Sequence, residues 1–110
     1  MRKTSTLALA LLLAGMAAPA AEFDGHLMDT MCAATRLNQA AGHTLRCIKK
    51  CSKSGFGIVT NEGQYVRFDE AGNVKALRAL KQTAKQDNLL AKVSGQMKDG
   101  VIQVDKLTIE

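Results

Sequence analysis

The sequence has few aromatic residues and almost no proline. It contains no tryptophan, one tyrosine and three phenylalanines in 110 residues, with a formal net charge of +5. Proteins that bind single-stranded nucleic acid stack bases on aromatic side chains along a strongly basic groove, so we expect no nucleic-acid partner. The one proline is Pro19. Without a proline-rich or low-complexity linker, the chain shows no sign of a domain boundary.

The signatures of common enzyme sites are also missing. The sequence has no Gly-x-Ser-x-Gly, no phosphate-binding glycine loop and no His-Glu-x-x-His. No pair of carboxylates has a spacing that suggests acid–base catalysis, and the serines and histidines are too scattered to form a triad. We therefore predict a protein that is not an enzyme.

The first twenty residues have the three parts of an export signal. Arg2 and Lys3 are followed by an apolar run at 7–14, and small residues end the segment at Ala20. The apolar run is too short to span a bilayer. We predict that residues 1–20 are a signal peptide, removed by cleavage after Ala20, and that residues 21–110 form a single small domain with a formal charge of +3. The mature protein is expected to be periplasmic or secreted, soluble and without a transmembrane segment.

Alternation of apolar and polar residues predicts five strands. They span residues 22–28, 58–60, 64–68, 90–97 and 101–109. Turns at 61–63 and 98–100 predict two hairpins. In the last strand the apolar residues change phase between Val104 and Leu107, which predicts a β-bulge.

Helical spacing predicts two short helices between the first two strands and a longer one between the third and fourth. Asp29 and Thr44 are expected to cap the short helices and Asn73 the long one. The long helix would span 74–85, with a core face of Val74, Leu77, Leu80 and Ala84. This order predicts a mainly β, α+β fold: a small five-stranded OB-like barrel with a helix between its third and fourth strands and a cysteine-bearing helical insertion after the first.

Three cysteines, Cys32, Cys47 and Cys51, lie in the predicted insertion. Exported domains of this size often use a disulfide as a staple. Cysteines four residues apart on one helix rarely reach bonding geometry, so Cys32 is expected to pair with Cys47 or with Cys51. The remaining thiol would be buried, or would join two chains as a homodimer.

A metal site is the alternative. Cys32, Cys47 and Cys51, with His43 or His26 as a fourth ligand, would make a Cys3His set suited to zinc or another thiophilic ion. The spacing is not that of a standard zinc finger, because there is no Cys-x-x-Cys.

Thiol redox chemistry is a third possibility. Cys32 lies near a predicted helix N-terminus and Cys51 beside several lysines, where a thiolate is favoured. The Cys-x-x-Cys of thioredoxin-like proteins is absent.

The same residues resemble those of a known family. The pattern Gly-x-x-x-Asp-x-x-Cys…His…Cys-x-x-x-Cys is made by Gly25, Asp29, Cys32, His43, Cys47 and Cys51. It is similar to that of a family of small exported bacterial proteins of uncharacterised function, whose Val-x-Gly and Gly-x-Ile segments resemble residues 93–95 and 100–102. The chain differs at Ala33, where the family has glycine, and in a longer spacer at 35–42. The resemblance implies an OB-like fold and no particular activity.

These patterns together predict a small exported binding or structural module, stabilised by a disulfide and needing no cofactor. The sequence names no partner for it.

Overall fold

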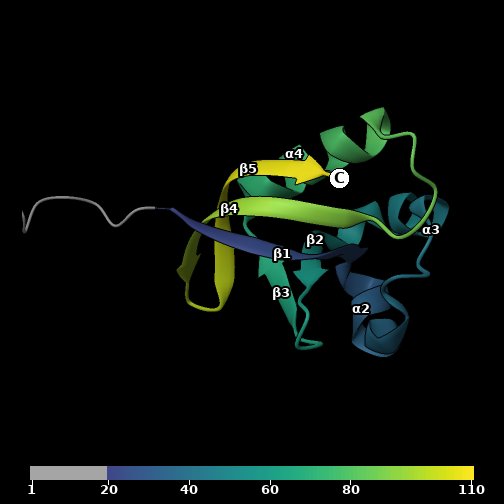
Figure 1. The fold of residues 1–110 in the computed structure, drawn as a ribbon, viewed down its shortest axis with the longest axis horizontal. Coiled ribbons are helices and arrows are strands. Elements are labelled where there is room, and N and C mark those ends of the chain that lie inside the picture. Colours follow the sequence, from purple (N-terminus) through teal and green to yellow (C-terminus); the bar gives the residue numbers. More distant parts are fainter. Residues whose placement is uncertain (1–19) are drawn as a thin grey trace, which may run out of the picture.

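The computed structural model describes residues 20–110, so the predicted signal peptide lies outside the described residues except for Ala20. The chain has an α+β fold in which five strands form one mixed sheet that closes into a ring (Figure 1). The elements are, in order, β1 (Ala21–Asp29), α2 (Thr30–Arg36), η1 (Leu37–Gln39), α3 (Leu45–Lys50), η2 (Ser52–Ser54), β2 (Phe56–Val59), β3 (Tyr65–Phe68), α4 (Glu70–Gln82), β4 (Leu90–Lys98) and β5 (Val101–Ile109). Within residues 20–110, no helix has the length and apolar character needed to cross a membrane.

The sheet closes because β1 has two partners. The first half of β1 pairs with β4, and its second half pairs with β2 from His26 opposite Val59 to Asp29 opposite Phe56. The parallel pairing of β3 with β5 joins the two remaining edges. This closing pair is short, because it joins only Arg67 and Phe68 of β3 to Val101 and Ile102 of β5.

Both predicted hairpins are confirmed. Strand β2 pairs with β3, and β4 pairs with β5, each antiparallel. The predicted bulge is also confirmed, because the register passes from Ser94 opposite Lys106 to Gly95 opposite Val104 and leaves Asp105 as the extra residue. The bulge explains why the buried residues of β5 change phase.

The prediction for the long helix is wrong at its start and in part of its buried face. Helix α4 begins after Asp69, whose carboxylate accepts a hydrogen bond from the backbone N–H of Gly72 at 2.8 Å. Asn73 lies inside the helix, and its side chain accepts the backbone N–H of Phe56 at 2.8 Å. Leu80 is buried and Leu77 packs against the core, as predicted, but Val74 is 54% exposed and Ala84 lies beyond the helix. The other buried residues of the helix are Gly72 and Ala76.

The main hydrophobic core fills the space between the sheet and α4, and includes Leu27, Ile58, Phe68, Leu80 and Ile102. Helices α2 and α3 lie together at the end of the sheet where β1 ends (Figure 1). A second, smaller apolar cluster there consists of Met28, Ala33, Ala40 and Val59, with Cys32 and Tyr65 packed against it. This cluster carries the helical insertion and the candidate site.

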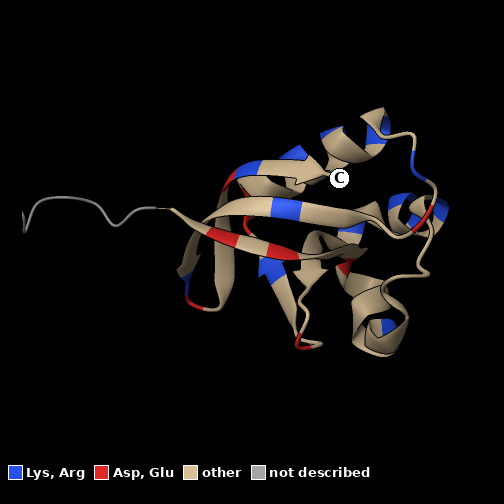
Figure 2. Cartoon of the chain, viewed as in Figure 1, with Lys and Arg blue, Asp and Glu red and all other residues tan. Residues whose placement is uncertain are grey.

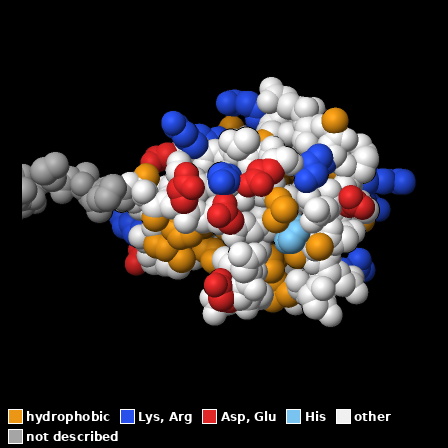
Figure 3. All heavy atoms as spheres, in the orientation of Figure 1, with side chains coloured by type: hydrophobic (Ala, Val, Ile, Leu, Met, Phe, Trp, Pro, Cys, Tyr) orange, Lys and Arg blue, Asp and Glu red, His pale blue; other side chains and the backbone are white. Residues whose placement is uncertain are grey.

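Charged residues of both signs are spread over the surface. Acidic residues occur on β1, and lysine and arginine residues occur on α3, α4 and several strands (Figure 2). The face seen in Figure 3 intersperses acidic, basic and apolar side chains. This face therefore carries no continuous basic surface.

Candidate thiol and carboxylate site

Asp29 is the centre of the site. It is the last residue of β1, is 0% exposed and is the N-cap of α2. One carboxylate oxygen, Oδ2, accepts the backbone N–H of Cys32 at 2.9 Å. The expected cap is thus confirmed, and it holds a buried carboxylate one helical turn from a thiol.

His43 lies against the other oxygen of the same carboxylate. Its Nε2 is 3.1 Å from Asp29 Oδ1, and both residues are buried. An ionised carboxylate only accepts hydrogen bonds, so Nε2 is the donor when Asp29 is ionised. The contact fixes the carboxylate and holds the segment after η1 over the end of β1.

A network of backbone and serine contacts places Cys51 beside Cys32. The backbone N–H of Thr30 donates to the Gly55 carbonyl at 2.9 Å. The Ser54 hydroxyl accepts the N–H of Met31 at 3.1 Å and donates to the Cys51 carbonyl at 2.8 Å. These bonds satisfy N–H groups that the first turn of α2 would otherwise leave unpaired. They also dock η2, and Cys51 with it, on the start of α2.

Three potential ligand atoms meet at this point. The sulfurs of Cys32 and Cys51 and a carboxylate oxygen of Asp29 all lie within 4.8 Å of one another. Both cysteines are half-buried and are free thiols in this structure. Two thiols this close, next to a carboxylate, can form a disulfide or bind a cation.

The environment of Cys32 keeps its thiol protonated. Burial, the charge of Asp29, the hydrogen bond to Asp29 and the neighbouring Cys51 together raise the pKa of Cys32 to about 11, and burial contributes most. The sequence led us to expect that the helix N-terminus would favour the thiolate at Cys32. The raised pKa goes against that expectation, because burial and the charge of Asp29 both disfavour the thiolate.

Tyr65 borders the site from β3. Its hydroxyl donates to the Met28 carbonyl at 3.2 Å and lies 2.9 Å from the Thr30 hydroxyl. The pKa of Tyr65 is raised to about 12, because burial and the nearby charge of Asp29 outweigh the lowering by the hydrogen bond to Thr30 and the charge of Arg67. The phenol therefore stays neutral and ties β3 to the start of α2.

The structure brings only some of the candidate cysteines and histidines into one site. It brings Cys32 and Cys51 together, with His43 one hydrogen bond away through Asp29. Cys47 is one of the residues lining a groove between α3 and the loop before β4. The ring of His26 is bonded instead to the Asn88 side chain, at 2.7 Å.

Asp29 is the site residue that the sequence analysis missed. It was expected only as a helix cap, although the spacing Asp-x-x-Cys contains the relevant signal. A capping side chain accepts the backbone N–H of the residue three positions further along the chain. Here that residue is Cys32. The proximity of Cys32 and Cys51 had no comparable local signal in the sequence.

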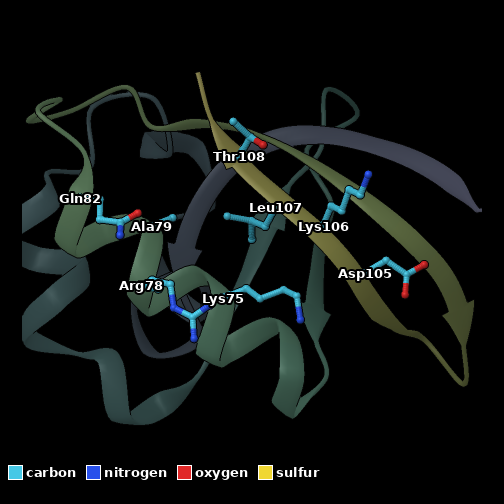
Figure 4. A pocket seen from close by; sticks show the side chains of 8 residues that line it. All are labelled: Lys75, Arg78, Ala79, Gln82, Asp105, Lys106, Leu107 and Thr108. Carbon is cyan, nitrogen blue, oxygen red and sulfur yellow. The ribbon is translucent and has the colours of Figure 1, made fainter.

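A second hollow lies between α4 and β5. Its lining includes Lys75 and Arg78 from the helix and Asp105 and Lys106 from the strand (Figure 4). The side chains of Asp105 and Lys106 point away from α4, so the basic groups do not converge on one point. Among the described residues, no buried side-chain polar atom lacks a hydrogen-bond partner, so no unpaired buried group marks this hollow as a binding site.

The thiol and carboxylate site is thus the one place where reactive side chains converge within the described part of the chain. Comparison of the whole chain with protein-family models, with curated proteins and with solved structures finds no match.

Proposed function

We propose that this protein is a small exported module with a binding or structural role, in which a disulfide between Cys32 and Cys51 staples the helical insertion to the sheet. The observation that carries this proposal is the approach of the two sulfurs, which lie within 4.8 Å of each other. Export rests on the signal-like residues 1–20 and on the resemblance to exported proteins. In an oxidising compartment two such thiols readily form a disulfide.

We also propose that the closed sheet is an OB-like barrel. The order β1-β2-β3-β5-β4 and the helix between β3 and β4 support this assignment, because OB-folds are five-stranded Greek-key barrels. The helical insertion after β1 then covers one end of the barrel.

A disulfide between Cys32 and Cys51 would hold a segment that adds little to the main core. The insertion contributes few residues to the main core, and most residues from 34 to 39 are exposed. Two backbone bonds hold its far side, from Asn88 N–H to the Ala41 carbonyl and from Leu45 N–H to the Gln86 carbonyl. Closing a loop of this length with a disulfide stabilises a protein by about 3 kcal/mol.

The proposal makes Cys47 the unpaired thiol. Cys47 is half-buried and lines a groove to which Cys32 does not contribute, and it could join two chains as a homodimer. A role in catalysis is not part of the proposal, because the raised pKa of Cys32 disfavours the thiolate that an attacking cysteine needs.

Thiol counting on the exported protein, purified without reductant and then unfolded, tests the staple. We expect one labelled thiol, at Cys47, and a disulfide-linked peptide pair that contains Cys32 and Cys51. Cys32→Ser should lower the free energy of unfolding by about 2–4 kcal/mol, whereas Cys47→Ser should change it by less than about 0.5 kcal/mol. For the monomer, three labelled thiols, or a bond from Cys47 to Cys32 or to Cys51, would contradict the proposal, whereas a Cys47–Cys47 bond between two chains would identify the homodimer.

N-terminal sequencing of the same sample tests export. We expect the mature chain to begin at Ala21, after cleavage behind Ala20. A chain that still begins at Met1 would remove the basis for the oxidising compartment and thus for the disulfide.

An extracytoplasmic metal-binding protein with a Cys3His site is the second candidate. Its ligands would be Cys32, Cys47, Cys51 and either His43 or His26. The proximity of Cys32 and Cys51 favours metal binding in general, but Cys47 and His26 would have to move to take part. Thiol redox chemistry stands third.

A further inference from the structure

We infer that the chain with reduced cysteines binds one zinc ion through Asp29, Cys32 and Cys51, with His43 holding the Asp29 carboxylate in place. The site differs from the Cys3His set considered above, since it uses a carboxylate and omits Cys47. It also goes beyond the disulfide-stapled module, because it concerns the same two sulfurs in their reduced state.

The distances suit a tetrahedral ion. Zinc binds sulfur at about 2.3 Å and carboxylate oxygen at about 2.1 Å, which places ligand atoms roughly 3.5–3.8 Å apart around a tetrahedron. The three ligand atoms here are already within 4.8 Å of one another without an ion. A contraction of about 1 Å or less would complete the three-ligand geometry, and side-chain rotation is enough for that.

The donor atoms indicate which cation fits. Two sulfurs exclude calcium and magnesium, which are bound through oxygen. The carboxylate oxygen suits zinc, a borderline ion that accepts cysteine, histidine and carboxylate ligands together. Three protein ligands leave a fourth position open to water or to an external ligand, as in zinc sites that exchange a ligand.

The hydrogen bonds that would orient the Asp29 carboxylate toward an ion are already present. Zinc-binding carboxylates are usually hydrogen-bonded by neighbouring groups that fix their orientation. Here His43 Nε2 contacts Oδ1 at 3.1 Å, and the Cys32 backbone N–H binds Oδ2 at 2.9 Å. Asp29 is fully buried while Cys32 and Cys51 are half-buried, so the ion would enter from the thiol side.

The charges also suit a divalent ion once it binds. Binding displaces the protons of the Cys32 and Cys51 thiols into solvent. The two positive charges of the ion then offset the two thiolates that form beside the Asp29 carboxylate.

A zinc titration of the full mature chain tests the site. The protein is kept reduced with a phosphine in metal-free buffer, and zinc is titrated against a chromophoric chelator, with native mass spectrometry for stoichiometry. We expect one zinc per chain and no binding of calcium or magnesium. Cys51→Ser and Asp29→Asn should each weaken zinc binding at least a hundredfold, and His43→Gln should weaken it about 10–100-fold.

Cys47→Ser is the matched control and should bind zinc as the unaltered chain does. Cobalt provides a second readout, because bound Co²⁺ should show a tetrahedral spectrum with a thiolate charge-transfer band that shrinks in Cys51→Ser. The spectrum of the unaltered chain is informative even if Asp29→Asn folds poorly. Circular dichroism checks the fold of each variant.

Several results would overturn the inference. They are the absence of zinc binding by the reduced chain, equal losses in Cys47→Ser and Cys51→Ser, and unchanged affinity in folded Asp29→Asn. The oxidised chain with Cys32 joined to Cys51 should bind no zinc at this site. Failure of the disulfide proposal is seen separately, as three free thiols in the exported protein, so the two ideas can fail independently.

Discussion

Asp29 and His43, fourteen residues apart in the sequence, meet through a contact of 3.1 Å between Oδ1 and Nε2 where both side chains are buried. The contact joins the end of β1 to the segment that follows η1. It therefore closes the helical insertion over the thiol pair, and it orients the carboxylate that borders both sulfurs. The stability of the insertion and the chemistry of the site depend on the same carboxylate.

Tyr65 should ionise at unusually high pH. Its side chain is half-buried, and we expect a pKa of about 12 instead of the ordinary 10.0. Tyr65 is the only tyrosine and the chain has no tryptophan, so the phenolate absorbance reports on this residue alone. The same titration in denaturant is the control and should show a midpoint near 10. A midpoint near 10 in the folded protein would contradict the partial burial of this side chain.

Cys32 of the reduced protein should react slowly with iodoacetamide at pH 8. Its rate should rise with pH until about 11, because burial and the Asp29 charge raise the pKa of this thiol. Peptide mapping by mass spectrometry follows Cys32 separately from the other cysteines. Asp29→Asn should move the rate profile to lower pH, and unfolding should move it further. A plateau near pH 9 in the folded chain would argue against the close carboxylate.

The raised pKa values of Cys32 and Tyr65 predict how the stability of the reduced protein depends on pH. Cys32 and Tyr65 both have a higher pKa in the folded state than their ordinary values of 9.0 and 10.0. Between about pH 9 and about pH 12 the folded state therefore binds more protons than the unfolded state. The stability these groups contribute should be complete below about pH 9 and should be lost progressively up to about pH 12. Urea unfolding at a series of pH values checks this, and Tyr65→Phe should reduce the loss above pH 10.

Two substitutions on α4 distinguish its buried face from its exposed face. Leu80 is 1% exposed and Val74 is 54% exposed. Leu80→Ala should lower the free energy of unfolding by about 2–5 kcal/mol, and Val74→Ala should lower it by less than about 1 kcal/mol. Urea denaturation followed by circular dichroism measures both. Equal effects would mean that α4 is rotated relative to the sheet.

Gly95 should not tolerate a side chain. An added Cβ would lie 2.0 Å from the carbonyl oxygen of Gln103 on the neighbouring strand, next to the bulge. Gly95→Ala should destabilise the protein by about 1–3 kcal/mol, because a backbone atom must move. Gly42→Ala is the matched control, since its nearest atom is 4.0 Å away, and it should change stability by less than about 0.5 kcal/mol. Similar midpoints for the two variants in urea denaturation would show that the strands are not this close.

Several features of the fold followed from local sequence because their causes are local. The hairpins depend on turn residues and alternating strands, and the cap at Thr44 depends on a side chain that accepts the N–H of Cys47 three residues later. The bulge was visible because a two-residue period must shift by one when an extra residue enters a strand.

The start of α4 shows where local reasoning stops. Both Asp69 and Asn73 are good capping residues. Asp69 also accepts the N–H of Val104, at 3.2 Å, while Asn73 binds the backbone of Phe56. These partners lie on distant strands, so the choice between the two caps depends on the closed sheet.

The thiol site divides in the same way. By itself the sequence determined that three cysteines share one insertion and that Asp29 caps the helix carrying Cys32, because these relationships span only a few residues. Only the tertiary structure decided that Cys51, and not Cys47, lies beside Cys32 and that His43 contacts Asp29. The reason is physical: pairing of β1 with β2 and the bonds from Thr30 and Met31 to Gly55 and Ser54 dock η2 on α2. Such contacts between distant segments leave no periodic trace in the residues that make them.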